Sequence, residues 1–195
     1  MVKLVTISFD EFKEEIYPYY LELFPKNERK SLNSIEKPYL KSITKLVKIV
    51  DGDTTVGFLI YNTIPDIKYV QLDYFAIFKK YQNQKYGSQA IFLFKDYFKD
   101  YYGIYGEVEK LGYGKTQEEN NIRKKRIKFW ENLGFTMLDV DLCLFDVVYT
   151  ACIYKITDKE LDTDDIIDSA FKIYMALIGE KRVNDNCRVI KDNIL

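Results

Sequence analysis

Apolar residues in the first part of the chain follow a helical spacing. Over residues 9–23 an apolar side chain recurs every three or four positions, which predicts a helix. The preceding segment Ser8–Glu11 has the sequence of a capping box, and Pro18 predicts a kink in this helix. A polar connector over residues 24–38 follows. The chain therefore begins, on this pattern, with one helix and a polar linker.

Runs of β-branched and aromatic residues predict three strands after the connector. Residues 45–50 and 54–64 flank Asp51–Asp53, whose central glycine accepts the positive φ that a tight hairpin turn requires. Residues 69–78 form an apolar run without a breaker, as expected of a central strand. A polar segment then leads into a helix predicted at residues 88–101.

The second half of the chain repeats this alternation of strand and helix. Residues 104–110 predict a strand, and residues 118–133 predict a basic amphipathic helix that ends at Gly134. Residues 135–156 hold two strands that divide near Asp146. The order of these elements predicts an α/β fold, in which a mixed sheet carries helices on both faces.

Composition changes to acidic and polar beyond residue 156. A last helix is predicted at residues 163–179, with Thr163 as its N-cap, and the rest reads as a polar tail. We expect a domain at residues 1–156 and a C-terminal helical extension at residues 157–195. The apolar stripe of the last helix must be covered, either by this chain's own core or by a second copy in a homodimer.

Composition removes several classes of function. The 195 residues are 47% hydrophobic, which is enough for one core. The net charge of -1, from 29 Lys and Arg against 30 Asp and Glu, argues against a nucleic-acid partner. The absence of histidine excludes Ser-His-Asp and Cys-His nucleophiles and histidine-containing metal sites. Acid–base chemistry is left to carboxylates, Tyr, Lys or Cys.

Cysteine spacing and hydropathy bear on location. Cys143, Cys152 and Cys187 form neither a disulfide framework nor a paired zinc or redox motif, which fits a reducing compartment. The chain begins without a secretory apolar run, and no apolar stretch approaches the roughly 20 residues that span a bilayer. We expect a cytoplasmic protein with no membrane partner.

The junction between the strand at 69–78 and the following helix is the most informative block. A strand that leads through a polar loop into a helix directs unpaired N–H groups and the positive end of the helix dipole toward one point, which suits an anion. Gly87 lets the backbone approach a diphosphate, and Ser88 is placed to cap the helix or bind a phosphate oxygen. Lysines supply positive charge at positions 79, 80 and 85. An ordinary turn with solvated lysines explains the block equally well.

In this block Gln82, Lys85 and Gly87 occupy the three positions that define a loop motif known from one protein family. The next helix carries residues that match the same family at Asn120, Phe129, Gly134 and Phe135. The block resembles the acyl-CoA loop of the GNAT superfamily of N-acyltransferases, with Lys85 in place of a glycine. The resemblance covers about residues 20–156 and is dense between 70 and 135. It implies a GNAT-like acetyltransferase domain with a mostly antiparallel sheet of six or seven strands.

The resemblance also implies the substrates and their binding residues. Acetyl-CoA is expected as co-substrate and a primary amine as acceptor, without a metal. In the family the strand before the loop bulges and splays from its neighbour, its backbone pairs with the pantetheine amides, and the N–H of Ile77 would face the thioester oxygen. The implied cofactor-binding residues are Phe75, Ala76, Ile77, Gln82, Asn83, Gln84, Lys85, Tyr86, Gly87, Ser88, Asn120 and Phe129.

Three carboxylates are candidates for the catalytic base. Asp73 is the first, because strand alternation puts Gln71, Asp73 and Phe75 on one face, and the family often has a carboxylate on this strand. An exposed aspartate or a structural ion pair is the alternative. Glu107 and Glu109 share a face of the adjoining strand and suit a base or an amine anchor, unless they only solvate the strand end.

The general acid is harder to assign. Much of the family has a Tyr four residues before the Gly-Phe pair, where this chain has Trp130. An indole does not give up a proton at useful cost, so Trp130 reads as a core residue. Another of the 17 tyrosines then serves, or the thiolate leaves unassisted, because a thiol pKa near 8.5 makes it a fair leaving group.

Two further motifs compete with this interpretation. Gly112–Thr116 ends like a phosphate-binding P-loop, but the required first glycine is replaced by Glu109, which repels phosphate. The basic run Arg123–Lys128 resembles a nucleic-acid patch, yet it lies on a helix with an apolar opposite face. The sequence thus favours an acetyl-CoA-dependent N-acetyltransferase that works through a ternary complex. The alternative is a catalytically inactive acyl-CoA-binding sensor or partner module of the same fold.

Overall fold

The computed structural model describes residues 1–190, which fold around one sheet. Strands and helices alternate along the chain as the apolar pattern predicts. Their bounds are β1 Val2–Thr6, α1 Phe9–Glu11, the π turn η1 Phe12–Ile16, α2 Tyr17–Leu23, the 3₁₀ turn η2 Lys26–Glu28, α3 Leu32–Leu40, β2 Thr44–Asp51, β3 Thr54–Asn62, β4 Tyr69–Ile77, the 3₁₀ turn η3 Lys79–Tyr81, α4 Tyr86–Asp96, β5 Gly103–Glu109, α5 Gln117–Asn132, β6 Thr136–Leu144, β7 Val147–Lys155, α6 Thr163–Ile178, α7 Glu180–Asn186 and β8 Cys187–Ile190.

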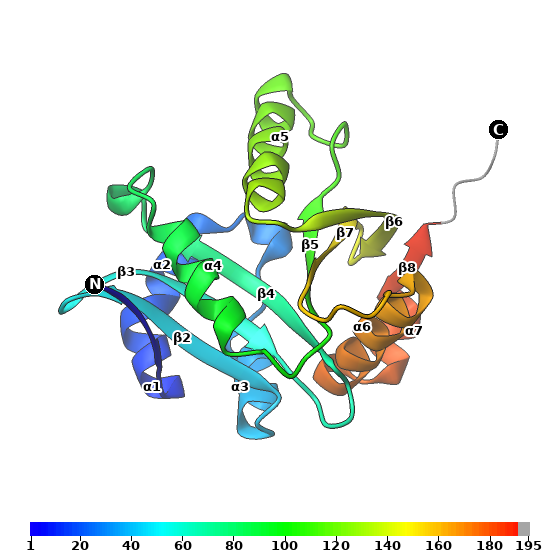
Figure 1. The fold of residues 1–195 in the computed structure, drawn as a ribbon, viewed down its shortest axis with the longest axis horizontal. Helices are drawn as coiled ribbons and strands as arrows, with labels where there is room; N and C mark the ends of the chain where they lie inside the picture. Colours follow the sequence, from blue (N-terminus) through cyan, green and yellow to red (C-terminus); the bar gives the residue numbers. More distant parts are fainter. Residues whose placement is uncertain (191–195) are drawn as a thin grey trace.

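Within residues 1–190 the sheet has eight strands in the order β1-β2-β3-β4-β5-β7-β6-β8 (Figure 1). Among these described strands only β4 and β5 pair in parallel, and every other neighbouring pair is antiparallel. The predicted mixed, mostly antiparallel sheet is therefore confirmed. The predicted number of strands, six or seven, is lower than the eight that are observed. The unpredicted strands are β1 and β8, which lie at the two edges of the sheet.

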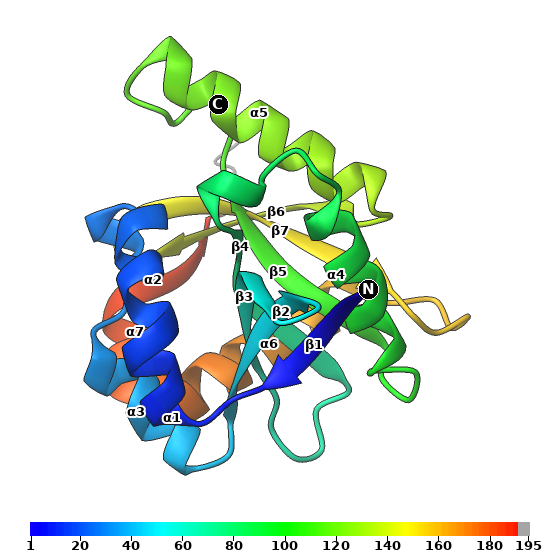
Figure 2. The same cartoon turned by 90° about the vertical axis from the view of Figure 1, so that its left-hand side faces the viewer.

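Helices cover both faces of the sheet, as predicted. Figure 2 shows α1, α2, α3 and α6 on one side of the strands and α4 on the other. On the first face, Phe12, Ile16 and Tyr20 are buried in one cluster with Leu46 and Phe58 of the strands. Burial of large side chains of this kind contributes about 1.5–3 kcal/mol each. The N-terminal helices are thus fixed beside the splayed end of β4.

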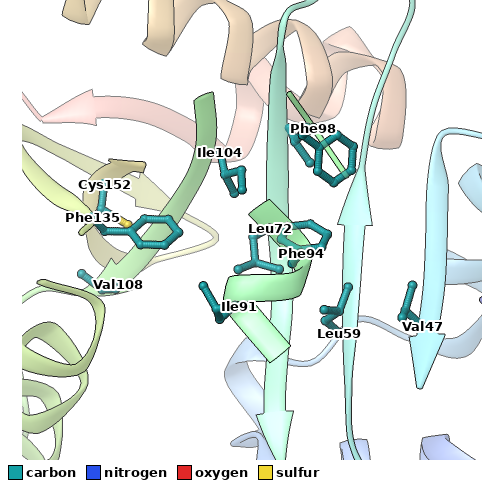
Figure 3. Packing of buried hydrophobic residues seen from close by; sticks show 11 residues of the cluster. Val47, Leu59, Leu72, Ile91, Phe94, Phe98, Ile104, Val108, Phe135 and Cys152 are labelled. Atoms are coloured by element: carbon teal, nitrogen blue, oxygen red, sulfur yellow. The ribbon is translucent and has the colours of Figure 1, made fainter. Parts of the chain in front are cut away.

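The second face is closed by α4. Its Ile91 and Phe94 lie over Leu59 and Leu72 of the sheet, and the same cluster continues across β5 to Cys152 of β7 (Figure 3). Apolar side chains therefore fill this face on both sides of the boundary between β4 and β5.

The N-terminal helix and its connector depart in part from the prediction. Residues 9–23 are helical throughout, but the π turn η1 interrupts them up to Ile16, and Pro18 lies in the first turn of α2, where its missing N–H costs no bond within that helix. The connector is more ordered than its polar composition indicates, because Ser31 caps α3 through a bond from the Ser34 N–H to its hydroxyl (3.2 Å). Pro38 lies inside that helix.

The hairpin at residues 51–53 and the turn near residue 146 form as predicted, and α5 ends before Gly134. The helix predicted at 88–101 instead spans 86–96.

The C-terminal segment belongs to the same sheet. The N-cap of α6 is Asp162 and not Thr163, because the Asp162 side chain accepts the Asp164 N–H (3.1 Å). The predicted polar tail contains α7 and β8, and β8 pairs with β6. The apolar stripe of α6 is buried against β4, β5 and β7 through Ile166, Ala170 and Tyr174, so this chain's own core covers it.

Candidate functional site

A cleft opens where β4 and β5 separate. The two strands pair only from Tyr69–Gln71 to Gly103–Tyr105, and beyond these residues they diverge. The cleft has a volume of about 610 Å³. Its floor comes from β4 and β5, one wall from the connector after α2, the other wall from the β6–β7 turn and α6, and one end from Trp130 of α5. The site is therefore built by segments from most of the chain.

A bulge in β4 shapes the floor of the cleft. Ile60 lies opposite Tyr74 and Tyr61 lies opposite Leu72, so Asp73 is the extra residue of the bulge. The bulge reverses the alternation of side chains, and the prediction that Phe75 shares a face with Asp73 is wrong. Phe75 packs on the α4 side against Phe129 and Trp130, at ring-centroid distances of 6.2 and 5.6 Å.

The end of β4 directs backbone groups into the gap. The Phe78 N–H donates to the Val56 carbonyl (2.9 Å), and hydrogen-bonded pairs alternate along an antiparallel ladder. Ala76 therefore faces β3, while the N–H groups of Phe75 and Ile77 face away from it, toward the side where β5 has diverged. The Ile77 carbonyl accepts a bond from Gln82 Nε2 (3.0 Å). An extended ligand can pair with this stretch of β4.

The loop after β4 ends in a helix start whose first turn has no side-chain cap among the described residues. The N-cap is Lys85, so Ser88 is not the cap and lies exposed in the first turn of α4. The amides of residues 86–88 and the helix dipole there favour an anion. Lys85 adopts a φ of 64°, in the left-handed region that favours glycine, which explains the glycine of the resembled loop.

Other side chains of the loop hold it in shape. Gln84 Nε2 donates to the Lys80 carbonyl (3.0 Å), and the Tyr86 hydroxyl donates to Asp51 (3.0 Å). Asn83 also has a positive φ, of 62°. At Gly87 a Cβ would lie 3.3 Å from the Phe129 ring, so only glycine lets this helix start approach α5 without displacing the ring.

Glu107 lies on the floor of the cleft with a perturbed carboxyl group. Burial, and next the negative charge of Asp73, raise its pKa to about 7, although a hydrogen bond from the Tyr174 hydroxyl acts in the opposite direction. Gln71 Nε2 also donates to Glu107 Oε1 (3.2 Å). A carboxylate with a pKa near neutral pH is suited to accept and release protons.

Asp73 is engaged in an ion pair. Lys30 Nζ lies 2.5 Å from Asp73 Oδ2, and Asn62 Nδ2 donates to the same oxygen (3.1 Å). Asn62 is fully buried and also donates to Gln71 Oε1 (2.9 Å). Asp73 and Glu107 are therefore linked through one polar network. The cation of this network, Lys30, is paired with Asp73.

Glu109 is paired with two cations from α5. Arg123 lies 3.3 Å from Glu109, and Arg126 donates to its other oxygen. Close by, burial and next the charge of Glu109 raise the pKa of Glu28 to about 7. Glu28 and Lys30 come from the connector and were not predicted as site residues. The connector is held over the cleft because Tyr20 accepts the Lys30 N–H (2.6 Å) and Tyr74 donates to the Glu28 carbonyl (2.6 Å).

Two residues named from the sequence lie apart from the floor. The Asn120 carboxamide accepts the N–H groups of Gly112 and Gly114 (2.9 and 3.1 Å) and donates to the Gly114 and Thr116 carbonyls (3.1 and 3.0 Å). The hydrogen bonds of the Asn120 side chain therefore hold the loop before α5 in its conformation. These bonds also occupy the N–H groups that a P-loop would offer to phosphate. Trp130 lies at the end of the cleft and packs on Phe135.

Comparison with known proteins identifies the family. Residues 9–135, more than half of the chain, match the sequence profile described as the acetyltransferase (GNAT) family. The chain belongs to the GNAT acetyltransferase family. Membership implies acetyl transfer that depends on an acyl-CoA. No curated protein matches the chain in sequence.

Solved structures share this GNAT fold at low sequence identity. A protein of Bacteroides thetaiotaomicron assigned to the family has a TM-score of 0.73 at 19% identity, and the match covers 91% of this chain and 99% of that one. The Escherichia coli ribosomal-protein-S18-alanine N-acetyltransferase has a TM-score of 0.56 at 14% identity, over 83% and 98% of the two chains. A Bacillus subtilis acetyltransferase in complex with CoA has a TM-score of 0.59 at 13% identity, over 80% and 100%.

Among residues 1–190, no group of three or more Cys, Asp or Glu side chains is arranged to hold a metal ion. Within the same residues, no helix is both long and apolar enough to span a bilayer.

Proposed function

We propose that this protein transfers an acetyl group from acetyl-CoA to a primary amine in the cleft between β4 and β5. One observation carries the proposal: the cleft joins the open backbone edge of β4, beside the uncapped first turn of α4, to the half-buried carboxyl group of Glu107. The first of these features suits a diphosphate and its extended arm, and the second suits removal of a proton from an amine.

The binding residues supported by this geometry lie at the α4 end. The amides of Tyr86, Gly87 and Ser88 would hold the diphosphate, with Lys85 beside them. The backbone of Phe75 and Ile77 would pair with the pantetheine arm, and an N–H there would face the thioester oxygen as negative charge develops. Acetyl-CoA supplies an activated acetyl group with a good leaving group.

We assign the catalytic base to Glu107. A lysine-like amine has a pKa of about 10.4 and must lose a proton before its nitrogen bonds to the acetyl carbon. Asp73 and Glu109 are less suited to accept that proton, because each is paired with a fixed cation. In this assignment Glu107 accepts the ammonium proton before the nitrogen bonds to the acetyl carbon. The carbon–sulfur bond then breaks, the thiolate leaves, and the second proton of the amine passes to solvent. Trp130 cannot protonate the thiolate, whose parent thiol has a pKa of about 8.5.

A second function, acyl-CoA binding without catalysis, is favoured by Lys85 at the loop glycine and by Trp130 at the position of the usual tyrosine. We also propose a cytoplasmic location, supported by the three free and buried cysteines.

Free-thiol release on a panel of amines separates the two functions. The panel should contain small metabolites, polyamines, aminoglycosides, peptide N-termini and lysine peptides. An enzyme releases thiol only when acetyl-CoA and an amine are both present, and its initial-rate lines intersect, as a ternary complex requires. A sensor binds acetyl-CoA and releases no thiol with any amine.

A further inference from the structure

A hydrogen-bond chain connects the C-terminal segment to the floor of the cleft. The Tyr174 hydroxyl of α6 donates to Glu107 Oε1, and the hydroxyls of Tyr105 and Tyr174 lie 3.0 Å apart. Because Tyr174 has a single hydroxyl proton and gives it to Glu107, Tyr105 must be the donor to Tyr174. Both tyrosines are buried, at 1% and 6% exposure. Burial also raises the pKa of Tyr174 well above its usual range, so its hydroxyl keeps the proton that it donates.

The helix that supplies this hydroxyl lies outside the region that matches the family. The family profile ends at residue 135, and Tyr174 follows Glu107 by 67 positions. Leu177 and Ile178 of the same helix and Arg182 of α7 line the same cleft. The C-terminal segment is therefore a wall of the site as well as part of the sheet.

We infer that the C-terminal segment completes the active site, with Tyr174 as a positioning residue that orients the Glu107 carboxylate toward the cleft and stabilises its ionised form. The inference rests on the proposed function, because it requires Glu107 to be the base. A hydrogen bond donated to a carboxylate favours its charged form, and the bond from Tyr105 strengthens the one from Tyr174.

Other titratable groups also surround Glu107, from each neighbouring element. They are Asp73 of β4, Lys30 of the connector, Tyr149 and Cys152 of β7, and Cys187 of β8. Lys30 favours the ionised form and Asp73 disfavours it. Neither of these two charges changes when the Tyr174 hydroxyl is removed, so a Tyr174→Phe variant isolates the contribution of the hydrogen bond.

The test compares Tyr174→Phe with Tyr69→Phe. Tyr69 is a buried tyrosine of β4 whose hydroxyl donates to Asp165 of α6 (3.0 Å), so it also joins the sheet to this helix but does not line the cleft. Each variant removes one hydroxyl that forms a hydrogen bond between the sheet and α6. We expect Tyr174→Phe to move the acidic limb of the kcat/KM profile upward by about one pH unit, with the KM for acetyl-CoA unchanged. Tyr69→Phe should keep the wild-type profile.

The outcomes separate this inference from the proposed function. If Glu107→Gln turns over like the wild type, the proposed base is wrong and the inference falls with it. If Glu107→Gln is inactive while Tyr174→Phe keeps the acidic limb of the wild type, the inference alone is overturned.

Two further measurements keep the inference testable if Tyr174→Phe does not fold or no amine is found. Tyr105→Phe should move the limb in the same direction by a smaller amount, and an unchanged limb contradicts the hydrogen-bond chain. Carboxyl ¹³C NMR, with Glu107→Gln to assign the signal, measures the Glu107 pKa in both tyrosine variants without an acceptor. Equal values in Tyr105→Phe and wild type also count against the inference.

Discussion

Replacing Glu107 by Gln should inactivate the protein and, at alkaline pH, stabilise it. The Glu107 pKa is raised from 4.5 to about 7 in the folded state, chiefly by burial. Between these two values the folded protein holds a proton that the unfolded chain releases, so the free energy of unfolding falls as the pH rises through this window. The contribution of the neutral Glu107 carboxyl group to the free energy of unfolding is complete below pH 4.5 and lost above pH 7.

The magnitude follows from the size of the pKa shift. Each unit corresponds to about 1.36 kcal/mol, so the rise from 4.5 to about 7 gives an upper value of about 3 kcal/mol. Glu107 borders the open cleft, and solvent screening reduces this to roughly 1–2 kcal/mol. Glutamine keeps the shape and cannot ionise. The variant should therefore match the wild type near pH 4.5 and exceed its stability by this amount at pH 8.

Urea denaturation at pH 5 and pH 8 measures this difference, and thiol release measures catalysis. Loss of a general base lowers turnover by about 10²–10⁴-fold. Glu28→Gln is a matched control, because burial also raises the Glu28 pKa to about 7. It should show the stability gain at pH 8 without the loss in kcat. A Glu107→Gln protein that is equally destabilised at both pH values would refute this reasoning about the site.

Two further substitutions test other assignments. Asp73→Asn removes a negative charge that, together with burial, raises the Glu107 pKa. The acidic limb of the rate profile should therefore move to lower pH, while turnover at pH 8 stays unchanged. A turnover that falls about 100-fold or more would assign the base to Asp73 instead. Asn120→Ala removes the four hydrogen bonds that hold the loop before α5, and the free energy of unfolding in urea should fall by about 1–3 kcal/mol. The Kd of the Asn120→Ala protein for acetyl-CoA should not change, and weaker binding would restore the cofactor role that the family resemblance implies.

The central elements of the fold were predictable because their local signals agree. The hairpin turn, the central strand and α5 each combine apolar spacing with a breaker or cap at the right position. The edge strands lack this agreement. In β1 only Val2 is buried, and β8 is four residues long, so neither shows the alternation that predicts a strand. Their pairing is decided by the neighbouring strand.

The site was predictable where it is local in sequence and was missed where it is not. Backbone geometry around Gly87 follows from one loop, and a glycine motif reveals it. Lys30 and Tyr174 reach the floor from 43 and 67 residues away, so no spacing rule connects them to Asp73 or Glu107. The bulge at Asp73 likewise depends on the register with β3, which sequence alternation cannot reveal.

Titration of acetyl-CoA into the wild type, Ser88→Asn and Ser88→Asp by calorimetry tests the central claim, that the first turn of α4 holds the diphosphate. Ser88 is exposed in that turn, where an aspartate suits the helix dipole and leaves the fold intact. The wild type and Ser88→Asn should bind with similar Kd. The negative charge of Ser88→Asp, a few ångströms from the diphosphate, should weaken binding about tenfold. Equal affinity in all three proteins, or no binding to the wild type, would contradict the account.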